Sequence, residues 1–211
     1  WENNMKNAIV FLADGFEEIE AITVIDYLRR ANVDVKTVAV PSVTMKKENM
    51  PTGSHNITVV ADYSFSDFEE AYSKDLPDLV YIPGGMPGST NVGSCLAVID
   101  FVKKCFNAQK FVSAICAAPA VVLAKTGILM GKNWTCYPSM EEGIEKYCLN
   151  GENINECLKN SSHQKNVPFV VDGNVITGRG PGTAEEFAME LVKLLTNEET
   201  YNSIKKGSIQ R

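Results

Sequence analysis

The sequence predicts an α/β fold in which a mostly parallel sheet is covered by helices on both faces. Short apolar stretches rich in β-branched residues alternate along the chain with longer stretches whose apolar residues recur at helical spacing. Most of the strand-like stretches are apolar throughout, as is typical of strands buried on both faces. No repeat, low-complexity tract or linker divides the 211 residues. We therefore expect one domain from Met5 to Arg211, preceded by Trp1–Asn4 as a remnant of expression or processing.

The first half of the chain supplies two strands and two helices by these criteria. The first helix has acidic residues in its first turn and Arg29 and Arg30 near its end, which complements the helix dipole. Between the second strand and the second helix, the turn-like Pro51–Ser54 predicts a short antiparallel excursion. The expected elements are strand Asn7–Leu12, helix Glu17–Ala31, strand Val33–Val40, excursion strands Val43–Lys47 and Asn56–Tyr63, and helix Ser66–Tyr72 capped by Ser66 or Asp67.

The second half continues the alternation and ends in a hairpin and a strong amphipathic helix. Asp172-Gly173-Asn174 separates two short apolar stretches, as a hairpin turn does. The polar, irregular Asn150–Asn166 predicts a mobile surface insertion. The expected elements are strand Asp78–Ile82, helix Cys95–Phe106, strand Phe111–Ile115, hairpin strands Val167–Val171 and Val175–Thr177, and helix Thr183–Leu195.

Composition excludes several classes of function. The net charge of −6 offers no basic footprint, so we expect no nucleic-acid partner. The longest apolar run, Phe111–Ala124, is too short to span a membrane and contains Pro119, so we expect no membrane association. The six cysteines are dispersed and form no CxxC pair, which favours reduced thiols and a cytoplasmic location.

The segment KFVSAICAAPAVVLAK, Lys110–Lys125, predicts a reactive cysteine. Cys116 falls where a buried strand should end, and Pro119 suits the first turn of a following helix. The partial positive charge at a helix N-terminus would stabilise a thiolate there. A buried structural cysteine is the alternative at this position, and the residues alone weigh the two about equally.

Two further loops follow parallel strands and should meet Cys116 at one edge of the sheet. The loop Ala13–Glu20 carries Glu20, whose apolar sequence neighbours predict a buried carboxyl with a raised pKa that acts as a general acid. Glu17 and Glu18 are expected to be surface acids that complement the helix dipole. The loop Pro83–Asn91 carries Gly85, whose N–H could approach an oxyanion, although glycines there could also serve the turn alone.

Other motifs predict no cofactor and no metal. The Gly-rich GRGPGT that opens the last long helix lacks the spacing of a nucleotide fingerprint. No HExxH, paired-histidine pattern or Gly-x-Ser-x-Gly elbow is present. Of the two histidines, His55 lies in the excursion and His163 in the polar insertion, so neither is favoured as a base for Cys116.

Four strings in this order and spacing resemble the ThiJ/PfpI superfamily, most of all the branch typified by the human parkinsonism-associated deglycase: FLADGFEEIE, YIPGGMPG, AICAAP and GRGPGT. The resemblance covers essentially the whole chain from Met5. It implies a flavodoxin-like sandwich, a homodimer, and a nucleophilic, oxidation-sensitive cysteine that needs no cofactor. By position the nucleophile is Cys116, its partner acid Glu20, and the oxyanion amides those of Gly85 and Ala117.

Two departures from the family pattern bear on function. Protease-like members carry a histidine directly after the cysteine, where this chain has Ala117, which argues against peptidase activity. A histidine that the resembled branch often keeps near the site is replaced by Tyr137, a poor base at neutral pH because a tyrosine pKa is ordinarily about 10. Glu20 must then carry more of the proton transfer. The Asn150–Asn166 insertion is also longer than in that branch.

The leading hypothesis is a glyoxalase or deglycase that acts on small reactive carbonyls such as methylglyoxal, or on their protein adducts, through Cys116 and Glu20. An oxidative-stress sensor or redox chaperone with incidental catalysis is the alternative from another class. A dimeric binding module with an inactive site is a third reading, kept open by Tyr137. A role in thiazole monophosphate biosynthesis, an older family label, is ranked lower. The apolar Ile19, Val24 and Tyr27, on more than one face of the first helix, add modest support for the dimer.

Overall fold

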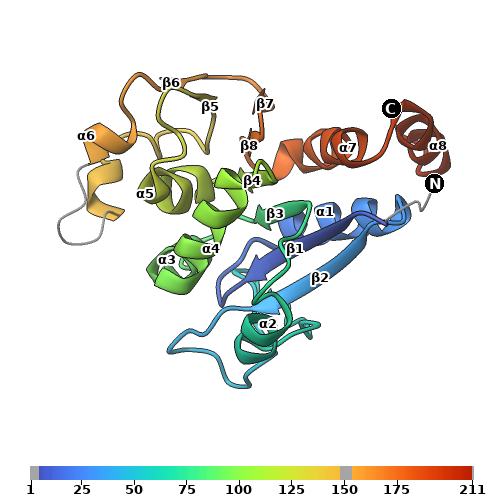
Figure 1. Ribbon diagram of the computed structural model, residues 1–211, viewed down its shortest axis with the longest axis horizontal. Coiled ribbons are helices and arrows are strands. Elements are labelled where there is room, and N and C mark those ends of the chain that lie inside the picture. The colour runs from blue at the N-terminus through green and yellow to red at the C-terminus, as the bar shows by residue number, and fades with distance from the viewer. Residues whose placement is uncertain (1–4, 148–153, 211) are drawn as a thin grey trace.

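The computed structural model describes residues 5–147 and 154–210, so the expected remnant at residues 1–4 lies outside it (Figure 1). Its central sheet has six strands in the order β2-β1-β3-β4-β8-β7. All neighbouring pairs are parallel except β8 with β7, which form the expected antiparallel hairpin. The strands are β1 Asn7–Leu12, β2 Asp34–Ala39, β3 Leu79–Ile82, β4 Phe111–Ile115, β7 Phe169–Asp172 and β8 Val175–Gly178.

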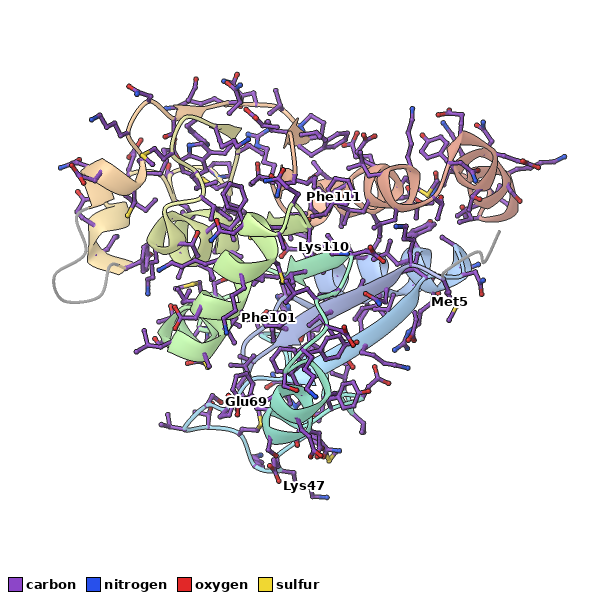
Figure 2. All side chains as sticks on the ribbon, viewed as in Figure 1. Met5, Lys47, Glu69, Phe101, Lys110 and Phe111 are labelled. Atoms are coloured by element: carbon purple, nitrogen blue, oxygen red, sulfur yellow. The ribbon has the colours of Figure 1, made fainter. Side chains whose placement is uncertain are left out.

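Helices cover both faces of this sheet. The β1-to-β2 and β3-to-β4 crossovers run in opposite directions across the sheet, so right-handed connections place α1 and α4 on opposite faces. α7 packs against α1, and α2 lies on the face of α4, where Phe68 and Phe101 meet edge to face at 4.9 Å (Figure 2). The helices are α1 Glu18–Arg30, α2 Phe65–Ala71, α3 Gly88–Ser94, α4 Leu96–Asn107, α5 Ala124–Thr126, α6 Ile154–Cys157, α7 Ala184–Leu195 and α8 Glu198–Gly207.

The predicted flavodoxin-like α/β sandwich is therefore confirmed. The central strands β1, β3 and β4 bury almost every side chain because both faces of the sheet are covered there. The buried apolar residues form one continuous core cluster. Its largest fully buried side chains include Tyr81, Phe11, Phe16 and Phe187.

Three local predictions were wrong. The segments Val43–Lys47 and Asn56–Tyr63 form no strands; the region contains only the isolated bridges Thr52–Thr58 and Val38–Tyr63. Ser64, rather than Ser66 or Asp67, caps α2, because its hydroxyl accepts from the Asp67 N–H while the Asp67 carboxylate accepts from the Ser64 N–H. The loop Pro83–Asn91 contains the start of a helix, α3.

The polar segment Asn150–Asn166 is also more regular than expected where the structure describes it. It contains α6 and the strand β6 Ser162–His163, which pairs in parallel with β5 Asn133–Trp134 to make a second, small sheet. Residues 148–153 lie outside the described residues. Among the residues that are described, no helix is both long and apolar enough to cross a membrane.

Candidate active site

Cys116 lies on a sharp turn between β4 and the π-helical segment Pro119–Leu123. Its backbone has φ +63°, a left-handed conformation that a non-glycine residue adopts only where the surroundings enforce it. Two backbone hydrogen bonds provide that constraint: the Cys116 N–H donates to Gly178 O at 2.9 Å, and the Tyr137 N–H donates to Cys116 O at 2.8 Å. Cys116 as a whole residue is 8% exposed and belongs to the buried core.

Glu20 reaches Cys116 from the first turn of α1. Its Oε2 accepts a hydrogen bond from Gly84 N at 2.8 Å and lies beside the Cys116 side chain, whereas its Oε1 is buried without a hydrogen-bond partner. The prediction that Glu20 is buried is confirmed, with no exposed surface, but the reason given for it was wrong. Ile19 and Ile22 point outward, at 56% and 44% exposed, because consecutive residues of a helix face different directions.

Burial raises the pKa of Glu20 to about 8. The hydrogen bonds from Cys116 and Gly84 oppose this shift, while the nearby Glu17 charge adds to it. Glu20 is therefore mostly protonated near neutral pH, as the sequence predicted, and can donate a proton to a neighbouring atom.

The pKa of Cys116 is raised, mainly by burial and further by the charge of Glu20 and its hydrogen bond. The amide N–H groups of Gly85 and Ala117 face the sulfur and act to lower its pKa, but they do not overcome burial. The structure therefore does not support the expectation that the helix dipole alone keeps Cys116 as a thiolate. A thiol whose proton is shared with Glu20 fits the geometry better, since the two groups disfavour being ionised together.

Gly84 and Gly85 carry no side chain, and this lets Glu20 and Cys116 approach one another. A Cβ on Gly84 would lie 2.6 Å from Glu20 Oε2 and 2.9 Å from Cys116 Sγ. Gly85 has φ +88° and is packed directly against the backbone of residues 15–17. The three expected loops thus meet at the carboxyl ends of β1, β3 and β4.

Glu17 and Glu18 are buried, contrary to the expectation of surface acids. Glu17 caps α1, its carboxylate accepting from Glu20 N at 2.7 Å. Glu18 accepts from His55 N and His55 Nδ1, at 2.6 and 2.8 Å, and so ties the excursion loop to the helix. His55 serves this contact and is not placed beside Cys116 by any described bond.

Tyr137 touches the site through its backbone bond to Cys116, while its side chain is 48% exposed. His163 is bound elsewhere: its Nε2 lies 3.6 Å from the sulfur of Cys136. Sequence reasoning missed that cysteine–histidine pair, because Cys136 lies just after β5 and His163 lies on β6, with 26 residues between them. Two groups of potential metal ligands are present among the described residues, Cys136–Glu141–His163 and Glu17–Glu18–His55.

Replacing Glu20 by glutamine is expected to change how stability depends on pH. The folded state raises the Glu20 pKa from 4.5 to about 8, so between these values the unfolded chain releases a proton that the folded chain retains. Wild-type stability from this group is thus fully present below pH 4.5 and is lost as the pH rises toward 8. The urea concentration at the unfolding midpoint, measured from pH 5 to 8, should therefore rise for Glu20→Gln relative to wild type as the pH rises. A difference between the two midpoints that does not change with pH would contradict the raised pKa.

Comparisons with known proteins show the family to which this chain belongs. The model of the DJ-1/PfpI family matches residues 6–194. The Drosophila melanogaster protein dj-1beta is 35% identical over 202 residues, covering 96% of each chain. Its crystal structure superposes with a TM-score of 0.80 at 34% identity, covering 97% of this chain and 98% of that one.

Two further relatives carry informative names. The Schizosaccharomyces pombe glutathione-independent glyoxalase DJ-1 is 28% identical over 210 residues, covering 96% of this chain and 98% of that protein. A structure of Toxoplasma gondii DJ-1, described as oxidized, has a TM-score of 0.77 at 30% identity and covers 97% of this chain and 98% of that one. With the family model spanning most of the sequence, the chain belongs to the DJ-1/PfpI family, in its DJ-1 branch.

Proposed function

We propose that the protein is a cofactor-independent glyoxalase, with Cys116 as nucleophile and methylglyoxal or a similar small dicarbonyl as substrate. One observation carries the proposal: the Cys116 sulfur lies between a proton-donating carboxyl, Glu20, and two backbone N–H groups, those of Gly85 and Ala117. The name of the S. pombe relative supports the same reaction class.

The first step is addition of the sulfur to the aldehyde. With a pKa of about 8, Glu20 is ionised in a minor fraction of molecules near neutral pH, and that fraction can take the Cys116 proton as Sγ attacks. The proton then passes from Glu20 to the aldehyde oxygen, giving a hemithioacetal. The N–H groups of Gly85 and Ala117 would stabilise the negative charge that develops on that oxygen.

The second step moves a proton between adjacent carbons. Glu20 removes the hydrogen from the carbon that bears sulfur, giving an enediolate, and returns a proton to the neighbouring carbon, while the hydroxyl proton of the hemithioacetal passes to the adjacent oxygen. The product is a thioester of lactate on Cys116, which water hydrolyses to lactate and the free thiol. The same attack on the adduct of a dicarbonyl with an amine would make the protein a deglycase.

Turnover in heavy water tests both the reaction and the role of Glu20. Purified protein incubated with methylglyoxal, without glutathione, is expected to form lactate that carries deuterium at C2, because the Glu20 proton exchanges with solvent. Proton NMR measures both product and label. Absence of lactate above the protein-free control would overturn the proposed function, whereas unlabelled lactate would keep the activity and reject a Glu20 proton that exchanges with solvent during turnover.

Oxidation sensing is the second candidate, favoured by the same buried sulfur and by the oxidized state named for the T. gondii structure. A sulfinate on Cys116 would accept hydrogen bonds from protonated Glu20 and the two amides. Two equivalents of peroxide are expected to add two oxygen atoms to Cys116, one from each peroxide, before other thiols react, measured by peptide mass spectrometry. Oxidation spread evenly over the cysteines would remove this candidate.

The setting proposed for this activity is a homodimer in the cytoplasm. Cys95, Cys105, Cys116 and Cys136 are free thiols, which supports a reducing compartment. Exposed Ile19 and Ile22 on α1 support a second buried contact. Val24, also expected there, instead lies in the core, and Tyr27 hydrogen-bonds Glu185 at 2.7 Å.

A further inference from the structure

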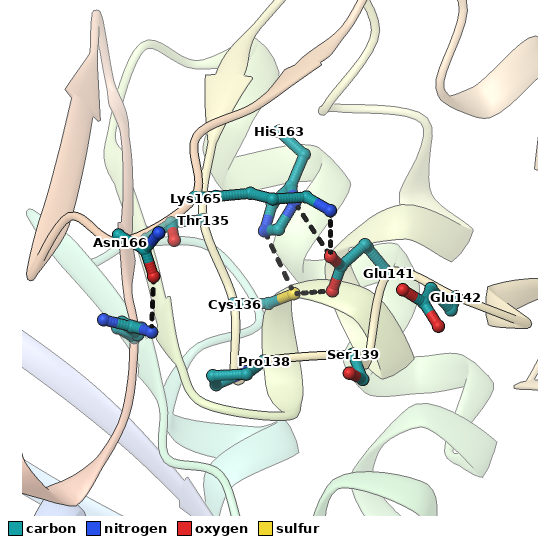
Figure 3. Close-up of a pocket in the computed structure, with 10 residues that line it drawn as sticks. Thr135, Cys136, Pro138, Ser139, Glu141, Glu142, His163, Lys165 and Asn166 are labelled. Carbon is teal, nitrogen blue, oxygen red and sulfur yellow. Dashed lines mark hydrogen bonds and ion pairs between the residues drawn. The ribbon is translucent and has the colours of Figure 1, made fainter.

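A second cluster of reactive side chains lies apart from the Cys116–Glu20 pair, on the small β5–β6 sheet and the turn that follows β5. Cys136, Glu141 and His163 line a cavity of about 160 Å³ and point toward one another (Figure 3). Cys136 Sγ lies 3.6 Å from His163 Nε2 and 4.0 Å from Glu141 Oε2. The proposed chemistry at Cys116 uses none of these side chains.

We propose that this cluster binds a zinc-like divalent cation through the Cys136 sulfur, an imidazole nitrogen of His163 and the carboxylate of Glu141. The fourth position would face the cavity and hold water or a small ligand. The mixture of thiolate, imidazole and carboxylate suits Zn²⁺ and not the all-oxygen preference of Mg²⁺ or Ca²⁺. This assignment departs from the sequence-based expectation of no metal.

The spacing fits a tetrahedral ion. A sulfur at about 2.3 Å and a nitrogen at about 2.0 Å from one tetrahedral Zn²⁺ lie roughly 3.5 Å apart, which is close to the Cys136–His163 distance of 3.6 Å. One ligand atom from each of the three residues falls within 4.8 Å of the others. Glu141 Oε2, at 4.0 Å from the sulfur, would have to move about 0.5 Å closer to complete the same tetrahedron.

The backbone holds the ligands in place. Trp134 and His163 are register partners across β5 and β6, and their rings pack with centroids 4.9 Å apart. Thr135 joins this sheet to the central one, since its N–H donates to Thr177 Oγ1 at 2.9 Å and its hydroxyl donates to Gln164 O at 2.8 Å. The site is therefore preorganised, which lowers the entropy cost of binding.

The protonation states suit a metal in part. Burial lowers the pKa of His163, so its imidazole is neutral and has a lone pair to offer. His163 Nδ1 is buried without a hydrogen bond, although it lies 3.4 Å from Glu141 Oε1. Burial and then the Glu141 charge raise the pKa of Cys136 to about 12, so a cation must displace the thiol proton to solvent as the sulfur–metal bond forms.

Two competing features are visible at the site. The Lys165 ammonium lies 3.3 Å from Glu141 Oε1, but its side chain is 66% exposed and can move into water. A Cys–His–Glu nucleophilic triad is the other chemistry that these residues could support. Cys136 is only 2% exposed, and its sulfur lies within hydrogen-bond distance of Tyr137 O, Glu141 Oε2 and His163 Nε2. This enclosure disfavours attack on a substrate and leaves room only for a small ion.

Zinc and cobalt titrations test the proposal on the full chain after dialysis against a chelator. Calorimetry with Zn²⁺ against a competing chelator should give one site, and Mg²⁺ should give none. One equivalent of Co²⁺ should produce a thiolate-to-cobalt charge-transfer band. Cys136→Ser should abolish the band, and His163→Gln should weaken Zn²⁺ binding by more than the roughly 10- to 100-fold typical of losing an outer partner.

The controls separate this site from the other ligand groups. His55→Gln removes the histidine of the Glu17–Glu18–His55 group, and Cys116→Ser removes the sulfur of the proposed active site; both should bind Zn²⁺ as wild type does. Unchanged Zn²⁺ affinity in a folded Cys136→Ser or His163→Gln would overturn the proposal, as would loss of binding in Cys116→Ser. Should Cys136→Ser fail to fold, a wild-type cobalt complex without a thiolate band would also reject it.

Discussion

Replacing Cys116 by serine is expected to lower kcat/KM for methylglyoxal by on the order of 10³-fold or more. A serine hydroxyl is far less acidic than a thiol, and a carboxylate with a pKa of about 8 is too weak a base to ionise it. The alcohol would also form an ester in place of a thioester, and an ester is hydrolysed more slowly. Steady-state formation of lactate measures the change.

Cys95→Ser is the matched control for this substitution. Cys95 begins α4 without a side-chain capping bond, so serine there alters no contact of the proposed site. Both variants should keep the wild-type unfolding midpoint within a few degrees, because serine differs from cysteine only by sulfur for oxygen. Retention of lactate formation by a folded Cys116→Ser would show that another group attacks the substrate.

The architecture could be predicted because it follows from periodicity over long segments. The β1 strand and the α1 and α7 helices have apolar patterns that permit only one placement in a covered parallel sheet. The small sheet of β5 and β6 has two residues in each strand, too few for any period to be visible. The sequence contains the Ser64 cap as the motif Ser-x-x-Asp, but Ser66 and Asp67 are also residue types that cap helices.

The residues of the proposed active site could be predicted from the sequence, but the pKa of its cysteine could not. Cys116, Glu20 and Gly85 were found because the ends of adjacent parallel strands meet in space. The pKa of Cys116 depends on two opposing effects: burial of the sulfur raises it, and the amides that face the sulfur lower it. The packing of the folded chain decides which effect is larger. The partnership of Cys136 and His163 depends on the β5–β6 register, which no local pattern encodes.

Gly85→Ala is expected to destabilise the fold by about 2–4 kcal/mol, through a strained backbone and a steric clash. Gly85 has φ +88°, and a Cβ there would collide with Gly15 O and lie 2.5 Å from Glu17 N. These are backbone atoms, so no side chain can rotate to make room. For a chain of this size the unfolding midpoint should fall by roughly 4–16 °C, measured by calorimetry.

Gly131→Ala separates the two causes. Gly131 also has positive φ, +71°, but a Cβ there would meet nothing within 4 Å, so it carries the backbone strain of about 1 kcal/mol alone. The additional fall in Gly85→Ala measures how tightly the loop after β3 is pressed against the loop after β1. That contact also aims the Gly85 N–H at the Cys116 sulfur, so lactate formation should fall in Gly85→Ala and not in Gly131→Ala. Equal losses of stability in the two variants would mean that the loops can separate freely, and the Gly85 amide would then not be held in place for a developing oxyanion.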